Sequence, residues 1–236
     1  MQIIPAVDVL DGRVVRLEQG RYDRVTAYGD DPVGAVRDWA GQGAEIVHVV
    51  DLAGARDGTA DTRLWGRLGE AGVPFQAGGG LRTVAAVVDA VGAGAERAVV
   101  GTAAVWSPDL IAEMIDGVGP GALVAAIDVG GTAARGAGWR DGGRPLEVVL
   151  GELGEAGIAR VLVTAIARDG TMTGPDLSLL DSVRLALPGV GVIASGGVGS
   201  LDDVRALAAA GYEAVIVGRA LYEERFTFAE AVEAGS

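Results

Sequence analysis

The sequence has 236 residues, half of them apolar, and a formal net charge of −13, which disfavours nucleic-acid binding because duplex affinity comes largely from Lys and Arg side chains that neutralise phosphates. With no cysteine and one histidine, His48, the chain has neither a disulfide framework nor a Cys- or His-rich metal site, so we expect no metal. All 19 basic residues are arginine, which excludes Schiff-base catalysis through a lysine amine. The apolar runs are shorter than the roughly 18 residues of a membrane span, so we expect no membrane partner.

The first segment, MQIIPAVDVLDGR, has the pattern of a strand that ends in acidic residues and not that of a signal peptide, so we expect a cytoplasmic protein. β-branched runs predict this strand and seven more, in chain order over residues 3–9, 45–51, 73–77, 97–101, 123–129, 160–164, 190–195 and 214–218. Apolar residues at spacings of three and four predict helices between them, including those over residues 32–42, 84–91, 146–155 and 201–209. Eight strand–helix units with short glycine-rich connections indicate an α/β fold, a closed (β/α)8 TIM barrel forming one domain over residues 1–236, because an open doubly wound sheet more often has five or six.

Several short motifs occur twice along the chain. AVDV at residues 6–9 returns as AIDV at 126–129, GGGLRT at 78–83 returns as SGGVGS at 195–200, and VVGTA at 99–103 returns as IVGRA at 216–220, in the same order and at nearly constant spacing. RDGT at 56–59 also returns, at 168–171, with a shorter spacing that implies a small insertion in the first half. Matches in constant order indicate duplication, so the barrel is predicted to consist of two similar half-barrels, about residues 1–118 and 119–236.

The duplicated aspartates Asp8 and Asp128 end predicted strands one and five. In a parallel barrel, the C-terminal ends of all strands open onto one face, where the following loops form the active site. A half-barrel repeat places the two carboxylates opposite each other across this face. A solvated acid or a helix cap is the simpler explanation for a single aspartate, but the recurrence in apolar strands favours a shared function. We therefore predict that Asp8 and Asp128 form an acid and base pair.

Glycine-rich turns follow four of the predicted strands. Glycine allows the backbone to approach a phosphate closely, and the amides of the following helix N-terminus supply hydrogen-bond donors. A tight turn explains any one glycine pair equally well, but two equivalent sets favour a ligand with a phosphate at each end and its middle over the aspartates. The predicted phosphate-binding residues are Gly79, Gly80, Gly101 and Thr102 in the first half, and Gly196, Gly197, Gly218 and Arg219 in the second.

These segments also carry a family resemblance that covers essentially the whole chain. The opening PAVDVLDGRVVRLEQG, the GGGLR and VVGTA pair, the segment ARDGTMTGPD and the closing SGGVGSLDDVRAL with VIVGRALYE resemble the ProFAR isomerases of histidine biosynthesis. The segment RGAGWRDGG at residues 135–143 is similar to the actinobacterial branch of that family. In that branch, some members also isomerise phosphoribosylanthranilate for tryptophan biosynthesis.

The resemblance implies an Amadori rearrangement of ProFAR to PRFAR, in which a small bis-phosphorylated aminoaldose becomes an aminoketose without a cofactor, and it implies a monomer. By likeness to the family, Asp8 is the proton acceptor and Asp128 the proton donor, which requires a raised pKa of Asp128. Thr164, at the end of strand six, matches a position that orients the acid. The loop residues expected to contact the substrate are Arg16, Gln19, Arg135, Trp139 and Asp169.

Structural roles compete for some of these residues. Asp169 lies in an Asp-Gly turn and is explained equally well as a turn former, and from His48 we expect only packing. Trp139 lies on a polar, glycine-rich loop where core packing is hard to arrange, so we interpret it as a lid aromatic that stacks on the imidazole ring.

The chain departs from the family pattern at two positions. Family members commonly carry an acidic residue directly after the threonine, where this chain has Ala165. The missing acid bears on how the Thr164 side chain is positioned. Gly78 stands where dual-specificity members tend to have serine, which favours a single substrate, whereas the RGAGW segment favours two. Two alternatives remain: the related cyclase of the same pathway, which resembles a pattern with an early lysine that this chain lacks, and a non-catalytic phosphate-binding barrel, which would not need both aspartates.

Overall fold

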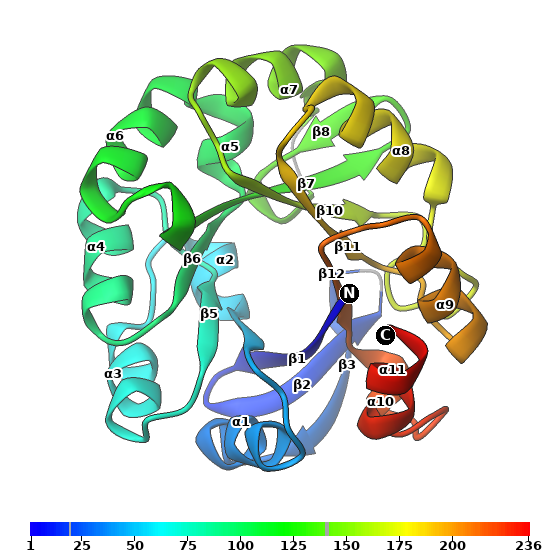
Figure 1. Cartoon of the computed structure of the whole chain (residues 1–236). Coiled ribbons are helices and arrows are strands. Elements are labelled where there is room, and N and C mark those ends of the chain that lie inside the picture. Colours follow the sequence, from blue (N-terminus) through cyan, green and yellow to red (C-terminus); the bar gives the residue numbers. More distant parts are fainter. Residues whose placement is uncertain (19, 140–141) are drawn as a thin grey trace.

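The computed structural model describes residues 1–18, 20–139 and 142–236. Within them, eight parallel strands form a closed barrel, because each strand pairs with the next along the chain and the last pairs with the first (Figure 1). The barrel strands are β1 (Gln2–Leu10), β4 (Val47–Asp51), β5 (Phe75–Gly78), β6 (Arg97–Val100), β7 (Leu123–Gly130), β10 (Arg160–Ala165), β11 (Gly191–Ser195) and β12 (Ala214–Val217). The predicted (β/α)8 barrel is confirmed, and each predicted strand lies on one of these elements.

Helices cover the outside of the barrel in a ring (Figure 1). The helices of the described residues are α1 (Pro32–Gly41), α2 (Leu52–Asp57), α3 (Thr62–Glu70), α4 (Val84–Gly92), α5 (Thr102–Trp106), α6 (Pro108–Val118), α7 (Leu146–Glu155), α8 (Leu177–Ala186), α9 (Leu201–Ala209), α10 (Arg219–Tyr222) and α11 (Phe228–Ala234), with 3-10 turns η1 (Pro120–Ala122) and η2 (Ala137–Trp139). Of these, α2 and η2 lie at the mouth of the barrel and not in the outer ring. α9 begins where the sequence predicts because Ser200 Oγ accepts from Asp203 N at 3.3 Å, while the Asp203 carboxylate accepts from Ser200 N at 3.0 Å. Among the described residues, no helix combines the length and the apolar character needed to cross a membrane.

Period-two alternation along the barrel strands decides which side chains face the lumen. In β1, Ile3 and Val7 pack in the layer between barrel and helices, whereas Ile4 and Ala6 belong to the core inside the barrel. Asp8 continues this inward series, at the end of the strand where the lumen opens. β7 repeats the arrangement, with Val124 and Ala126 followed by Asp128. The alternation therefore carries both aspartates to the inside of the barrel mouth.

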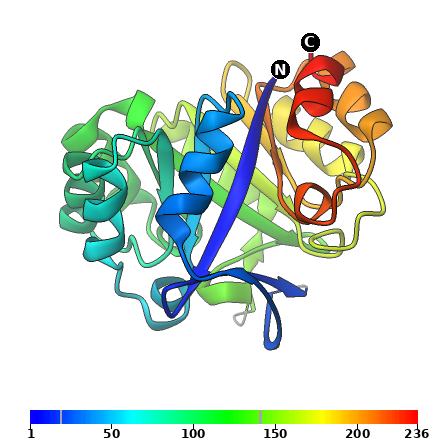
Figure 2. The same ribbon diagram turned by 90° about the horizontal axis from the view of Figure 1, so that it is seen from below.

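Antiparallel excursions follow the two strands that carry these aspartates. β2 (Arg13–Glu18) folds back on β1 and pairs with β3 (Arg21–Gly29), while β8 (Ala133–Arg135) folds back on β7 and pairs with β9 (Arg144–Pro145). Figure 2 shows the β2–β3 hairpin at the end of the barrel opposite the two chain termini. We interpreted both segments as loops from sequence, and that interpretation was wrong. β3 lacks the apolar alternation that would have revealed it, because nearly all of its residues are exposed.

Candidate active site

A cavity of about 280 Å³ opens at the C-terminal ends of the barrel strands. The structure brings the predicted site residues together around it, with the exception of Gln19, which lies outside the described residues. The predicted residues that line the cavity are Asp8, Arg16, Gly79, Gly80, Gly101, Thr102, Asp128, Arg135, Trp139, Thr164, Asp169, Gly196, Gly197, Gly218 and Arg219. Residues from both halves of the chain therefore share one cavity.

Asp8 forms an ion pair with Arg16 of the β2–β3 hairpin. Arg16 Nη1 donates to Asp8 Oδ2 at 2.6 Å, and only 18% of the Arg16 side chain and 13% of the Asp8 side chain are exposed. The guanidinium also reaches the turn after β12, where a Cβ atom at Gly218 would overlap Arg16 Nη2. A charge-assisted hydrogen bond between a guanidinium and a carboxylate is short and strong. Arg16 thus fixes the position of the Asp8 carboxylate at the cavity.

Asp128 lies in a different environment on the opposite half of the barrel. Burial raises the pKa of this carboxyl, while hydrogen bonds from Trp139 and Thr164 oppose that shift in part. Trp139 Nε1 donates to Asp128 Oδ2 at 2.7 Å, and Thr164 is the direct neighbour of Asp128 in the β7–β10 register. The two carboxyls therefore lie in different electrostatic surroundings: Asp8 is paired with a guanidinium, whereas burial dominates at Asp128.

Trp139 connects the segment between β8 and β9 to the β2–β3 hairpin. The residue has a left-handed backbone with φ 68°, and its N–H donates to Gly136 O at 2.8 Å. Its ring lies against the hairpin, because a Cβ atom at Gly20 would stand 2.7 Å from Trp139 Cζ3. The two excursions that follow β1 and β7 therefore meet over the cavity.

Asp169 is a third carboxylate at the cavity. Burial raises its pKa to about 6; the positive charge of Arg16 opposes the shift, and the negative charges of Asp8 and Asp128 add to it. Asp169 therefore interacts electrostatically with both predicted reacting carboxylates. A residue that only formed the turn would not need to place its carboxylate in this cavity.

Four of the predicted phosphate-binding glycines, Gly79, Gly80, Gly196 and Gly197, have a positive φ, which only glycine adopts readily. Gly79 and Gly197 have φ of 102° and 89°. A Cβ atom would overlap Asp51 O at Gly79 and Gly174 O at Gly197. Gly101, in contrast, has open space around its missing Cβ, so its backbone is accessible from the cavity that it lines. Arg219 Nη1 donates to Gly170 O at 2.7 Å and so joins the turn after β12 to the turn that carries Asp169.

The cavity residues that sequence reasoning missed include His48, Tyr22 and Arg82. His48, from which we expect only packing, also lines the cavity. Burial, and then the charge of Arg16, lower its pKa to about 3, so it is neutral at neutral pH. Its Nδ1 lies 3.0 Å from Gln76 Nε2. The inward alternation of its strand could have identified His48, and Arg82 directly follows the GGGL turn, but nothing in the sequence distinguishes Tyr22.

Fold and cavity define the chain as a (β/α)8 barrel with carboxylates at the mouth ends of two opposite strands. Comparison with known proteins adds the particular family: the model of the family described as histidine biosynthesis protein matches residues 2–227, and the chain belongs to this family. It is 44% identical over 239 residues to an isomerase of Citrobacter koseri, with 98% of each chain covered. Isomerases of the same name from Enterobacter sp. and Maricaulis maris are each 42% identical, again over 98% of both chains. The shared name describes an imidazole-4-carboxamide that carries two 5-phosphoribosyl groups.

Proposed function

We propose that this chain is the isomerase that converts ProFAR to PRFAR in histidine biosynthesis. The observation that carries the proposal is the placement of Asp8 and Asp128 on opposite strands of one cavity, between two sets of glycine turns. The family match and the identity to named isomerases over nearly the whole chain support the same activity. The reaction is an aldose–ketose isomerisation, which needs proton transfers and neither an oxidant nor a reductant.

In the proposed first step, Asp128 donates its proton to the ring oxygen of the aminoaldose. The C1–O bond breaks, and the lone pair of the attached nitrogen forms the C1=N bond of a Schiff base. A buried carboxyl with a raised pKa suits this role, because it holds a proton nearer to neutral pH than a solvated aspartate does. Thr164, the neighbour of Asp128 in the register, orients the carboxyl.

In the proposed second step, Asp8 removes the proton from C2 of the opened sugar. The C–H electrons form the C1–C2 double bond of an enaminol, and the C1=N electrons return to nitrogen. Transfer of the hydroxyl proton to a base and protonation of C1 then give the aminoketose. The ion pair with Arg16 holds the Asp8 carboxylate in position for the abstraction.

The two phosphates of the substrate are assigned to the two sets of glycine turns. Gly79, Gly80 and Gly101 form one set, and Gly196, Gly197 and Gly218 form the other; all of them line the cavity. Their backbone amides supply donors without a side chain in the way. A ligand held at both ends has its reacting carbons over the aspartates, which reduces the entropic cost of reaching the transition state.

An activity assay with the purified protein and ProFAR tests the proposal directly. The buffer contains a metal chelator and no added cofactor, and the change in absorbance reports turnover. We expect formation of PRFAR under these conditions. Phosphoribosylanthranilate in the same assay separates a single-substrate enzyme, which the triple glycine at Gly78 supports, from the bifunctional alternative that the RGAGW segment supports. Absence of turnover of ProFAR would contradict the proposal.

We expect Trp139→Phe to shift the pH dependence of kcat/KM. The indole N–H donates to Asp128 and stabilises its ionised form, so its removal raises the pKa of that carboxyl further. If protonated Asp128 is the required acid, the alkaline limb of the kcat/KM profile moves to higher pH. Trp106→Phe, on an exposed tryptophan that does not line the cavity, is the matched control. An unchanged alkaline limb in Trp139→Phe would argue against Asp128 as the acid.

A further inference from the structure

The RDGT segment of the first half is a repeated motif that the proposed reaction does not use. Its second-half counterpart carries Asp169, which lines the cavity. In the first half, Arg56 Nε and Nη2 donate to the two carboxylate oxygens of Asp57, each at 2.8 Å, and neither residue lines the cavity. Arg56 and Asp57 belong to the short helix α2, whereas Arg168 and Asp169 lie in the turn after β10. The same tetrapeptide thus has different surroundings in the two halves.

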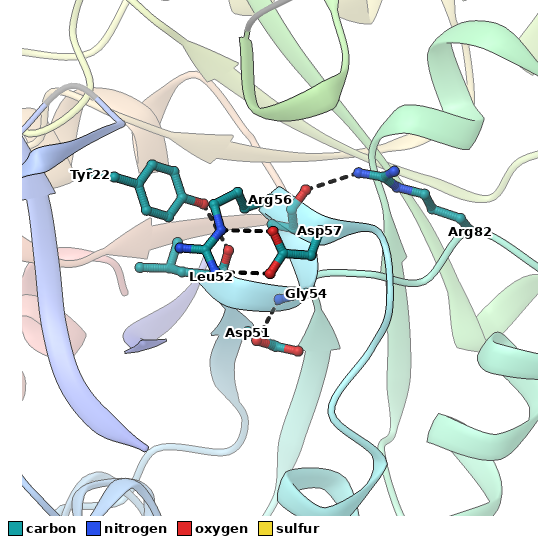
Figure 3. A network of polar contacts seen from close by, with 8 residues as sticks. Tyr22, Asp51, Leu52, Gly54, Arg56, Asp57 and Arg82 are labelled. Atoms are coloured by element: carbon teal, nitrogen blue, oxygen red, sulfur yellow. Dashed lines mark hydrogen bonds and ion pairs between the residues drawn. The ribbon is translucent and has the colours of Figure 1, made fainter. Parts of the chain in front are cut away.

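Helix α2 is fixed at both ends (Figure 3). At its start, Asp51 accepts from Gly54 N and from Asp61 N, each at 2.8 Å, and is only 4% exposed. Near its end, Arg82 Nη2 donates to Ala55 O at 2.9 Å, and Gly58 terminates the helix with φ 86°. A six-residue helix has little stability of its own. These hydrogen bonds therefore hold α2 in a fixed position beside the cavity.

Tyr22 attaches the β2–β3 hairpin to this helix. Of the nine residues of β3, Tyr22 alone is partly buried. Its hydroxyl donates to Leu52 O at 2.8 Å, and the Arg56 guanidinium carbon lies 5.7 Å from the centroid of its ring (Figure 3). At the other end of β3, the Tyr28 ring packs on Tyr222 with centroids 4.6 Å apart. The hairpin thus rests on the barrel near both ends of β3, and only the Tyr22 end reaches the cavity.

The hairpin controls two groups at the reacting centre. β2 carries Arg16, which pairs with Asp8 at 2.6 Å and covers Gly218. Gly20, between the hairpin strands, lies against the ring of Trp139, which in turn binds Asp128. A displacement of the hairpin from α2 would therefore move Arg16 away from Asp8 and remove the surface against which Trp139 packs.

We propose that Tyr22 is a positioning residue, which holds the β2–β3 hairpin on α2 and thereby keeps Arg16 on Asp8 and Trp139 on Asp128. The inference rests on the proposed function for the roles of the two aspartates, but the contacts themselves do not depend on it. Tyr22 acts through the hairpin and α2 and transfers no proton.

Tyr22→Phe tests the inference, because it removes the hydrogen bond to Leu52 O and keeps the ring. Trypsin cleaves after arginine, and Arg21 and Arg24 lie on exposed β3, so cleavage at these two bonds reports how often the hairpin leaves α2. We expect the native-state cleavage rate there to rise about five-fold, which corresponds to the ~1 kcal/mol of one hydrogen bond. KM for ProFAR rises by up to about five-fold and changes more than kcat, because binding must then also close the hairpin.

Tyr212→Phe is the matched control, since the Tyr212 hydroxyl donates to Asp181 Oδ1 at 2.8 Å away from the cavity. Mass spectrometry locates the cuts, and thermal unfolding shows that both variants are folded. Unchanged cleavage after Arg21 and Arg24 in Tyr22→Phe, or an equal rise in Tyr212→Phe, overturns the inference. If the wild-type protein does not turn over ProFAR, the proposed function fails, while the cleavage comparison still decides whether Tyr22 holds the hairpin.

Discussion

Asp8→Asn and Asp128→Asn should each lower kcat for ProFAR by about 10²- to 10⁴-fold, the usual contribution of a positioned general acid or base. The amide keeps the shape of the side chain but neither accepts the C2 proton, as ionised Asp8 would, nor donates a proton to the ring oxygen, as protonated Asp128 would. Steady-state kinetics with ProFAR measure the loss. Binding of the product, measured by calorimetry, should fall far less, because the glycine turns that hold the phosphates are unchanged.

Asp116→Asn provides the control for the loss of one negative charge. Asp116 is exposed on α6 and does not line the cavity, so its substitution should leave kcat and KM as they are. If either cavity variant retained the activity of Asp116→Asn, that aspartate would have no role in proton transfer. If product binding were lost together with turnover, the aspartate would be a binding residue and the assignment of the phosphates to the glycine turns would lose its main support.

Local sequence patterns predicted the barrel and the location of its mouth because both depend on periodicities of a few residues. The run Ile4, Ala6, Asp8 shows the inward face of β1 by alternation alone, and the repeat at Asp128 places the second carboxylate on the opposite side. The glycine turns were predicted for the same reason, since a positive φ such as that of Gly79 restricts a position to glycine almost independently of the fold.

Contacts that depend on how the hairpin lies over the barrel could not be predicted in this way. Arg16 reaches both Asp8 and Gly218, which are 210 residues apart, and the sequence around Arg16 contains no pattern that specifies either partner. The two RDGT segments also show this, because identical residues give a cavity carboxylate at Asp169 and an Arg56–Asp57 pair on α2 away from the cavity lining. Helix α2, which carries Arg56 and Asp57, is stabilised by Asp51 and Arg82 from outside the helix.

Asp169 is buried beside Asp8 and Asp128, and burial, with a smaller contribution from these neighbouring carboxyls, makes its ionisation unfavourable in the folded protein. Its pKa is raised to about 6 in the folded protein, whereas an unfolded aspartate titrates near 3.9. Between these pH values the folded state binds more protons than the unfolded state, so its stability falls as the pH rises from about 4 to about 6. Above that window, the cost of ionising Asp169 is fully present. Removing the charge should therefore stabilise the protein at neutral pH and not at pH 4.

We expect Asp169→Asn to raise the free energy of unfolding at pH 7 by about 1–3 kcal/mol, the range that corresponds to one to two pKa units. Urea denaturation at pH 4, 5, 6 and 7 measures the difference in the free energy of unfolding between the variant and wild type. Taking this difference cancels the contributions of all other titrating groups to first order. It should be near zero at pH 4, grow up to about pH 6 and then stay constant. Activity should fall in the same variant, because a cavity carboxylate kept at the expense of stability is expected to serve the reaction. A difference that is independent of pH, or a variant less stable than wild type at pH 7, would show that attraction to Arg16 outweighs both burial and repulsion from Asp8 and Asp128.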